Sequence, residues 1–93
     1  MNYKELSVKT TLNDLEKRTD KNGNSYFKIS AQWGPKNQIL YAFGHALPTE
    51  TLTALTNAPH NFINRLVLIT YQELPNREGN GNFFKVQQIE IVH

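Results

Sequence analysis

Hydrophobic and polar residues alternate along the first third of the chain, which predicts extended strands. Residues 5–15 form the first strand, and every second position from Leu6 to Leu12 shares one face. Leu15 breaks this alternation, because it lies three positions after Leu12. An extra residue in a strand shifts the phase in this way, so we expect a β-bulge or a bend before Leu15.

Residues 25–33 form a second strand with two different faces. Phe27, Ile29, Ala31 and Trp33 alternate with Tyr26, Lys28, Ser30 and Gln32. The Asp20-Lys21-Asn22-Gly23 segment before this strand predicts a hairpin turn, because Asn and Gly tolerate positive φ. Residues 34–37, GPKN, form the next turn, and residues 38–43 form a third strand. The first half of the chain is therefore a three-stranded meander.

A short helix follows the third strand. Pro48 suits a first helical turn, and Leu52 and Leu55 have the i,i+3 spacing of a helix that ends near Pro59. We expect one small helix in this region.

Two further strands complete the chain. Residues 65–74, RLVLITYQEL, are apolar on both faces, as the central strands of a barrel often are. A polar loop with two glycines leads from them to the last strand, residues 83–92. The apolar phase of this strand shifts between Val86 and Ile89, which predicts a second bulge.

Composition restricts the class of protein. With 93 residues, 39% of them hydrophobic, we expect a single globular domain over residues 1–93. The chain has no cysteine, so disulfides and thiolate metal sites are excluded. No signal peptide and no apolar run of roughly 18 residues is found, so we expect a cytoplasmic protein with no membrane partner. The net charge is only +2, so bulk charge does not indicate a nucleic-acid partner.

The order of three strands, one helix and two strands resembles the OB-fold. Residues 12–30, LNDLEKRTDKNGNSYFKIS, resemble the first hairpin of OB domains in replicative polymerases, replication protein A and aminoacyl-tRNA synthetases. Residues 38–44, QILYAFG, are similar to their third strand. The resemblance implies an all-β fold: a five-stranded OB-fold Greek-key barrel with one short helix between strands 3 and 4.

A second, local resemblance involves residues 61–74, NFINRLVLITYQEL, which are similar to part of the C-terminal OB domain of ATP-dependent DNA ligases. The chain has no Lys-x-Asp-Gly adenylation motif, and residues 84–93, FKVQQIEIVH, lack the basic closing motif of that domain. A relative of the ligases would therefore lack their catalytic machinery.

OB domains bind single strands across strands 2 and 3 and the loops beside them. The resemblance therefore implies a nucleic-acid site in which aromatic rings stack on bases and cations contact phosphates. The candidate residues are Lys17, Arg18, Lys21, Tyr26, Lys28, Trp33, Lys36, Tyr41 and Arg77.

Several of these residues have a purely structural alternative. Trp33 shares the phase of the core residues of its strand, so it is either a core residue or a stacking residue at the strand end. Tyr41 alternates with Leu40, and the sequence does not decide which of them faces inward. The cations at positions 17, 18 and 21 are interleaved with acidic residues, a pattern that is common on solvated surfaces.

The sequence contains no pattern that indicates a catalytic site or a metal-binding site. The three histidines show no ligand spacing, and Asp14, Glu16 and Asp20 are more typical of a solvated loop edge than of a metal site. No nucleophile motif or phosphate-binding glycine loop is found, so we expect neither an enzyme nor a cofactor.

The resulting hypothesis is a protein that binds single-stranded nucleic acid, DNA in preference to RNA, as an accessory to replication or recombination. A replication or repair protein is an expected further partner. The alternative is an OB-like module whose exposed face docks a partner subunit and binds nucleic acid weakly or not at all.

Overall fold

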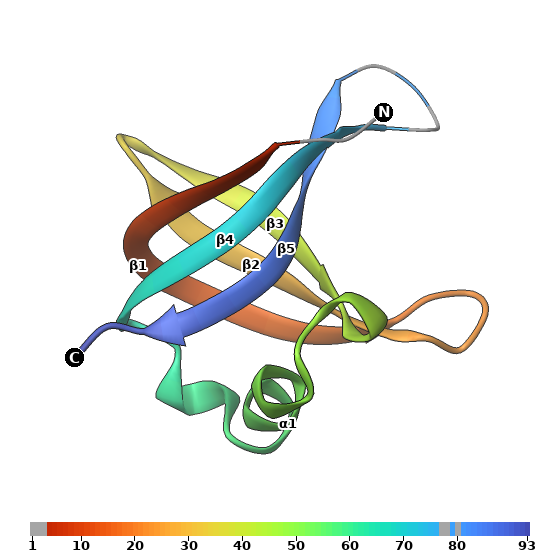
Figure 1. Ribbon diagram of the computed structural model, residues 1–93, viewed down its shortest axis with the longest axis horizontal. Helices are drawn as coiled ribbons and strands as arrows, with labels where there is room; N and C mark the ends of the chain where they lie inside the picture. The colour runs from red at the N-terminus through yellow and green to blue at the C-terminus, as the bar shows by residue number, and fades with distance from the viewer. Residues whose placement is uncertain (1–3, 77–78, 80) are drawn as a thin grey trace.

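Five strands form a closed barrel in the computed structural model, which describes residues 4–76, 79 and 81–93 (Figure 1). The strands are β1 (Glu5–Thr19), β2 (Ser25–Trp33), β3 (Lys36–Phe43), β4 (Leu66–Pro75) and β5 (Asn82–Ile91). They are neighbours in the order β1-β2-β3-β5-β4, and β4 pairs again with the first half of β1. β3 and β5 are parallel, and the other pairs are antiparallel. The predicted five-stranded OB barrel is confirmed.

The predicted helix is α1 (Thr49–Asn57), between β3 and β4, and it lies below the barrel in Figure 1. Leu55 of α1 has a fully buried side chain, which helps to close the end of the core that α1 covers. Two single-turn 3-10 helices, Gly44–Ala46 and Pro59–Asn61, flank α1 and were not predicted, because one turn is too short to leave a periodic pattern. No helix of the described residues is long and apolar enough to cross a bilayer.

Two β-bulges explain the breaks in alternation. The register of β1 against β2 shifts between Leu12 and Asp14, which makes Asn13 the extra residue. Leu12 and Leu15 are therefore both buried, although they lie three positions apart. In β5, the register against β4 shifts at Gln87 in the same way. Both predicted bulges are confirmed.

The core consists of side chains that point inward from all five strands and from α1. Phe27 and Ile29 are 1% and 0% exposed, so the predicted inward face of β2 is confirmed. The largest fully buried side chains are Phe27, Leu12, Ile29, Leu40, Leu55, Ile69, Val67 and Val86. The opposite face of β2, which begins with Tyr26, consequently points outward.

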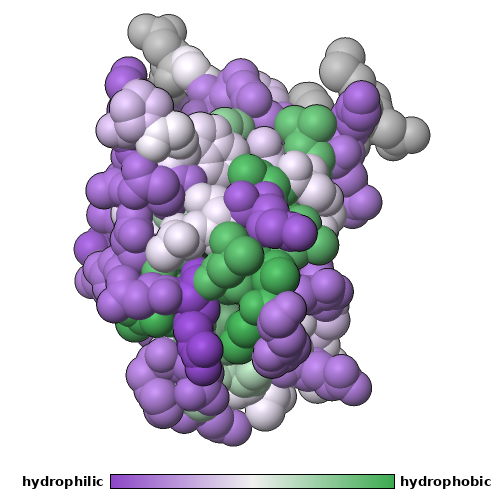
Figure 2. All heavy atoms as spheres, turned by 90° about the vertical axis from the view of Figure 1, so that its left-hand side faces the viewer, coloured by the Kyte–Doolittle hydropathy of each residue, from purple (hydrophilic) through white to green (hydrophobic). Residues whose placement is uncertain are grey.

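β4 is apolar on both faces, but only one of them is buried. Val67 and Ile69 are fully buried, whereas Leu66 on the outer face is 44% exposed. A single closed barrel covers only the inner face of its strands, so the outer apolar residues stay at the surface. Figure 2 shows one side of the molecule, on which hydrophobic residues gather among hydrophilic ones.

Candidate nucleic-acid interface

β2 and β3 present a cluster of aromatic rings on the outside of the barrel. Tyr26 of β2 is the register partner of Phe43 of β3, and their ring centroids are 6.0 Å apart. The ring of Tyr41 lies 6.2 Å from that of Tyr26. Leu40 and Ala42 are fully buried, so β3 turns Tyr41 and Phe43 outward. The structure thereby decides the orientation that the sequence left open.

β5 and the turn after β3 extend this cluster. Phe83 of β5 meets Phe43 edge to face, with ring centroids 6.5 Å apart. The imidazole of His45 stacks on Phe43, with ring centroids 6.0 Å apart. Four outward rings, from Tyr26, Tyr41, Phe43 and Phe83, therefore form one continuous surface, which we call the aromatic face.

Only two of the four rings of the aromatic face, Tyr26 and Tyr41, were predicted from the sequence. Phe43 has the same period-2 phase as Tyr41, and this was the available signal for it. Phe83 was not predicted, although its orientation follows from the bulge predicted between Val86 and Ile89. Counting back by twos from the buried Ile89 would turn Phe83 inward, but the extra residue inverts the phase and turns Phe84 inward instead.

A groove of about 480 Å³ lies over the aromatic face. It is lined by Asp20, Tyr26, Tyr41, Phe43, Asn76 and Phe83. Asp20 belongs to the β1–β2 loop, and Asn76 follows β4 at the start of the β4–β5 loop. The volume falls within the range of about 300–1,000 Å³ that is typical of small-ligand sites. Rings in such a groove can stack on nucleobases of any sequence.

The β1–β2 loop is held at the groove by its own hydrogen bonds. Oδ1 of Asp20 accepts the backbone N–H groups of Asn22 and Asn24, each at 2.9 Å. Gly23 has a φ of 86°, as predicted, whereas Asn22 does not adopt a positive φ. The carboxylate of Asp20 thus fixes the loop, and it also places a negative charge in the groove.

Two lysines flank Tyr41. Lys28 of β2 is its register partner on one side, and Lys85 of β5 is its register partner on the other. Both side chains are partly exposed and lie on the outer face of the barrel. Lys28 was predicted, but Lys85 was not, because the β3–β5 pairing joins segments that are far apart in the sequence.

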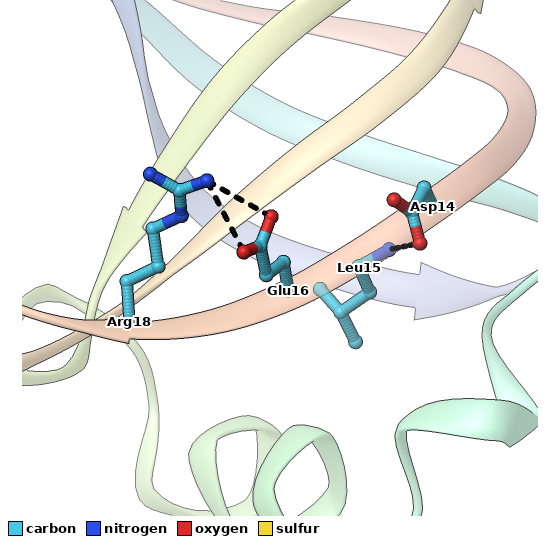
Figure 3. Close-up of polar contacts among 4 residues, drawn as sticks. All are labelled: Asp14, Leu15, Glu16 and Arg18. Carbon is cyan, nitrogen blue, oxygen red and sulfur yellow. Dashed lines mark hydrogen bonds and ion pairs between the residues drawn. The ribbon is translucent and has the colours of Figure 1, made fainter.

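Arg18 of β1 is the register partner of Tyr26, so it borders the aromatic face. Its guanidinium Nη2 lies 3.1 Å and 3.2 Å from the two carboxylate oxygens of Glu16 (Figure 3). This neighbour raises the pKa of Arg18 above its ordinary value. Leu15 points to the other side of β1, toward the core (Figure 3). Arg18 is therefore exposed at the edge of the aromatic face, and its guanidinium is paired with Glu16.

Three other predicted cations, at positions 17, 21 and 36, are not among the residues that line the groove. Lys17 is the register partner of the buried Phe27, so it occupies the opposite face of β1 from Arg18. Lys21 is exposed in the β1–β2 turn. Lys36 lies at the far end of the β2–β3 hairpin. Arg77 lies outside the described residues.

Trp33 packs against the core rather than on the aromatic face. Its ring centroid lies 5.5 Å from that of Tyr71 and 5.7 Å from that of Phe84. It is seven positions from Tyr26 along β2, or about 23 Å at the usual rise of a strand. Of the two alternatives for Trp33, the structure favours packing at the end of the barrel.

The acidic residues of β1 do not assemble with histidines. Asp14 uses Oδ1 to accept the backbone N–H of Leu15 at 2.9 Å, and Glu16 pairs with Arg18. Within residues 4–76, 79 and 81–93, no three His, Asp or Glu side chains lie close enough together to hold a metal ion.

Comparison with known proteins gives structural matches only. No family model and no curated protein matches the chain. Crystal structures of Rim1, a mitochondrial single-stranded DNA binding protein from S. cerevisiae, are similar to it. One crystal form has a TM-score of 0.74 at 17% identity, over 99% of this chain and 96% of Rim1. Another has a TM-score of 0.68 at 16% identity, over 98% and 97% of the two chains. At this identity the likeness concerns the fold: the chain has the OB fold.

Proposed function

We propose that the chain binds single-stranded nucleic acid, DNA in preference to RNA, along the aromatic face. The observation that carries the proposal is the set of four outward rings, which line one groove together with Asp20 and Asn76 and are flanked by Arg18, Lys28 and Lys85. Large apolar rings gathered at a surface usually mark a binding site. Rings stack on bases, and cations beside them contact the phosphates that connect those bases.

The energetics suit a small binding module. Stacking contributes about 1–3 kcal/mol per base, so two or three occupied rings supply most of a micromolar affinity. Each phosphate contact from Lys28 or Lys85 adds a salt-dependent part, with a log-log slope of roughly 0.7 on single strands. Binding of this kind depends on stacking strength more than on base identity, and it requires no catalytic group.

The preference for DNA is supported by the single-stranded DNA binding of the structurally similar Rim1. The role as an accessory to replication or recombination stays a prediction from the sequence. The structural similarity to Rim1 is also the support for a non-enzymatic role. The cytoplasmic location, the single domain over residues 1–93 and the replication or repair partner stay predictions from the sequence.

A second candidate is a module that docks a partner subunit through the same face. The charges favour it: Glu16 pairs with Arg18, Asp20 lines the groove, and the net charge is only +2. In this role the rings would pack on apolar side chains of the partner rather than on bases.

Fluorescence anisotropy distinguishes the two candidates. Labelled single-stranded DNA, single-stranded RNA and duplex DNA of equal length are titrated with protein at two salt concentrations. Salt-sensitive binding to single strands, with DNA bound most tightly, supports the proposal. Absence of binding at micromolar protein favours the docking module, and a preference for duplex contradicts both.

A further inference from the structure

A second groove, of about 330 Å³, lies between α1 and the end of β5. It shares no lining residue with the groove over the aromatic face. Its lining residues are Glu50, Thr51, Ala54, Phe62, Gln88, Ile89, Glu90, Ile91 and His93. Phe62 and Ile89 are buried core residues, and Ala54 and Ile91 are partly exposed. The groove therefore has an apolar floor that could receive an apolar side chain.

One polar group in this groove is held in a fixed orientation. The side-chain oxygen of Gln88 accepts two hydrogen bonds, from the hydroxyl of Thr51 and from the backbone N–H of Ile89. The NH₂ end of the same amide is therefore turned away from these donors, and no described residue accepts a hydrogen bond from it. An oriented N–H donor beside an apolar floor suits the carbonyl oxygen of a peptide.

The rim of the groove is acidic. Glu50, in the first turn of α1, and Glu90, near the end of β5, are both exposed. Neither has an ion-pair partner among the described residues, and no lysine or arginine lines the groove. Two unpaired carboxylates disfavour the phosphates of a nucleic acid and attract lysine or arginine.

We propose that this groove docks a peptide segment of another protein, in which one apolar side chain is flanked by lysine or arginine. The apolar side chain occupies the floor against Ala54 and Phe62, and a peptide carbonyl accepts a hydrogen bond from Gln88. The flanking cations lie beside Glu50 and Glu90. Because the two grooves share no lining residue, such a peptide and a nucleic-acid strand bind independently.

The test uses three fluorescein-labelled pentapeptides with blocked ends. The central residues are Lys-Leu-Lys in the first, Lys-Ser-Lys in the second and Glu-Leu-Glu in the third. ¹⁵N-labelled protein is titrated with each, and amide NMR signals are followed. We expect the Lys-Leu-Lys peptide to shift the signals of Thr51, Ala54 and Gln88 and to bind about tenfold more tightly than the other two. Equal binding of all three, or shifts confined to other residues, overturns the proposal.

Variants separate the groove from the rest of the surface. Glu50→Gln and Glu90→Gln should each weaken the Lys-Leu-Lys peptide about threefold, as expected for one exposed charge pair. Glu5→Gln, an exposed glutamate outside the groove, is the matched control and should have no effect. Ala54→Arg should block the groove and abolish peptide binding. Single-stranded DNA binding should be unchanged in all four variants, which keeps this test distinct from that of the proposed function.

Two further results would overturn the proposal. In the first, the peptide affinity is the same in Glu50→Gln, Glu90→Gln and the parent protein. In the second, sedimentation shows a dimer of the parent that dissociates in these variants, which would make a second copy of this chain the occupant.

Discussion

Tyr26 on β2 lies directly opposite Phe43 on β3, with their ring centroids 6.0 Å apart on the outside of the barrel. If these rings stack on bases, Tyr26→Ala and Phe43→Ala should each weaken binding of single-stranded DNA about tenfold at every salt concentration, because stacking is largely uncharged. Tyr26→Phe keeps the ring and should bind like the parent. Anisotropy titrations measure all three. If both alanine variants bind as the parent does, Tyr26 merely covers the hairpin and the proposal for this face fails.

The lysines on either side of Tyr41 should act through charge. Lys28→Ala and Lys85→Ala should each lower the slope of log affinity against log salt by roughly 0.7, the value for one phosphate on a single strand. Lys9→Ala is the matched control, since Lys9 is an exposed cation on β1 opposite Leu68 of β4, away from β2 and β3. An unchanged slope in both variants would show that these ammonium groups are only solvated.

Glu16 forms an ion pair with Arg18, and in the proposed function it would compete with phosphate for that cation. Glu16→Gln should therefore tighten the binding of single strands and steepen the salt dependence by roughly 0.7, because one more cation reaches the backbone. Adding Arg18→Ala to this variant should cancel the gain. The same anisotropy titrations measure both variants, and a gain that persists without Arg18 would instead point to the general loss of a negative charge.

Stability should depend on the inward face of β2. Phe27→Ala and Ile29→Ala should each lower the free energy of unfolding by about 2–5 kcal/mol. Both side chains are buried in the core, so truncating either one leaves a cavity. Urea unfolding measures this loss. Tyr26→Ala, one position along the same strand, should cost clearly less because its ring lies at the surface. Equal losses of unfolding free energy in Tyr26→Ala and Phe27→Ala would contradict the assignment of Phe27 to the core side of β2 and of Tyr26 to its outer side.

Tyr71 should make the protein sensitive to alkali. Burial, and then the negative charge of Glu73, raise the pKa of this phenol in the folded state. In the unfolded chain a tyrosine titrates near about pH 10. The folded state is thus fully stabilised below that pH, and stability is lost as the pH rises toward the higher folded pKa. Tyr71→Phe should remove this loss, so the parent and the variant should diverge in urea unfolding only above about pH 10. If the stabilities of the parent and of Tyr71→Phe differ by the same amount at all pH values, ionisation of Tyr71 is not the cause of the alkali sensitivity.

Local patterns in the sequence were sufficient to predict the five strands and the helix α1. They also predicted, for much of the chain, which side chains face the core and which face solvent. Alternation identified Phe27 and Ile29 as core residues and Tyr26 and Lys28 as surface residues, because successive side chains of a strand point to opposite faces. The bulges could be located as well, since an extra residue leaves a visible break in that alternation before Leu15 and after Val86.

The tertiary structure alone decided which surface residues come together. Lys85 and Phe83 join Tyr41 and Phe43 only because β5 closes the barrel beside β3, and no local pattern encodes a pairing between such distant segments. The same closure made Trp33 a packing residue, because the ring at the end of β2 meets side chains of β4 and β5 there. A strand's own sequence specifies its two faces, but the neighbours on each face depend on long-range register, which the closed barrel determines.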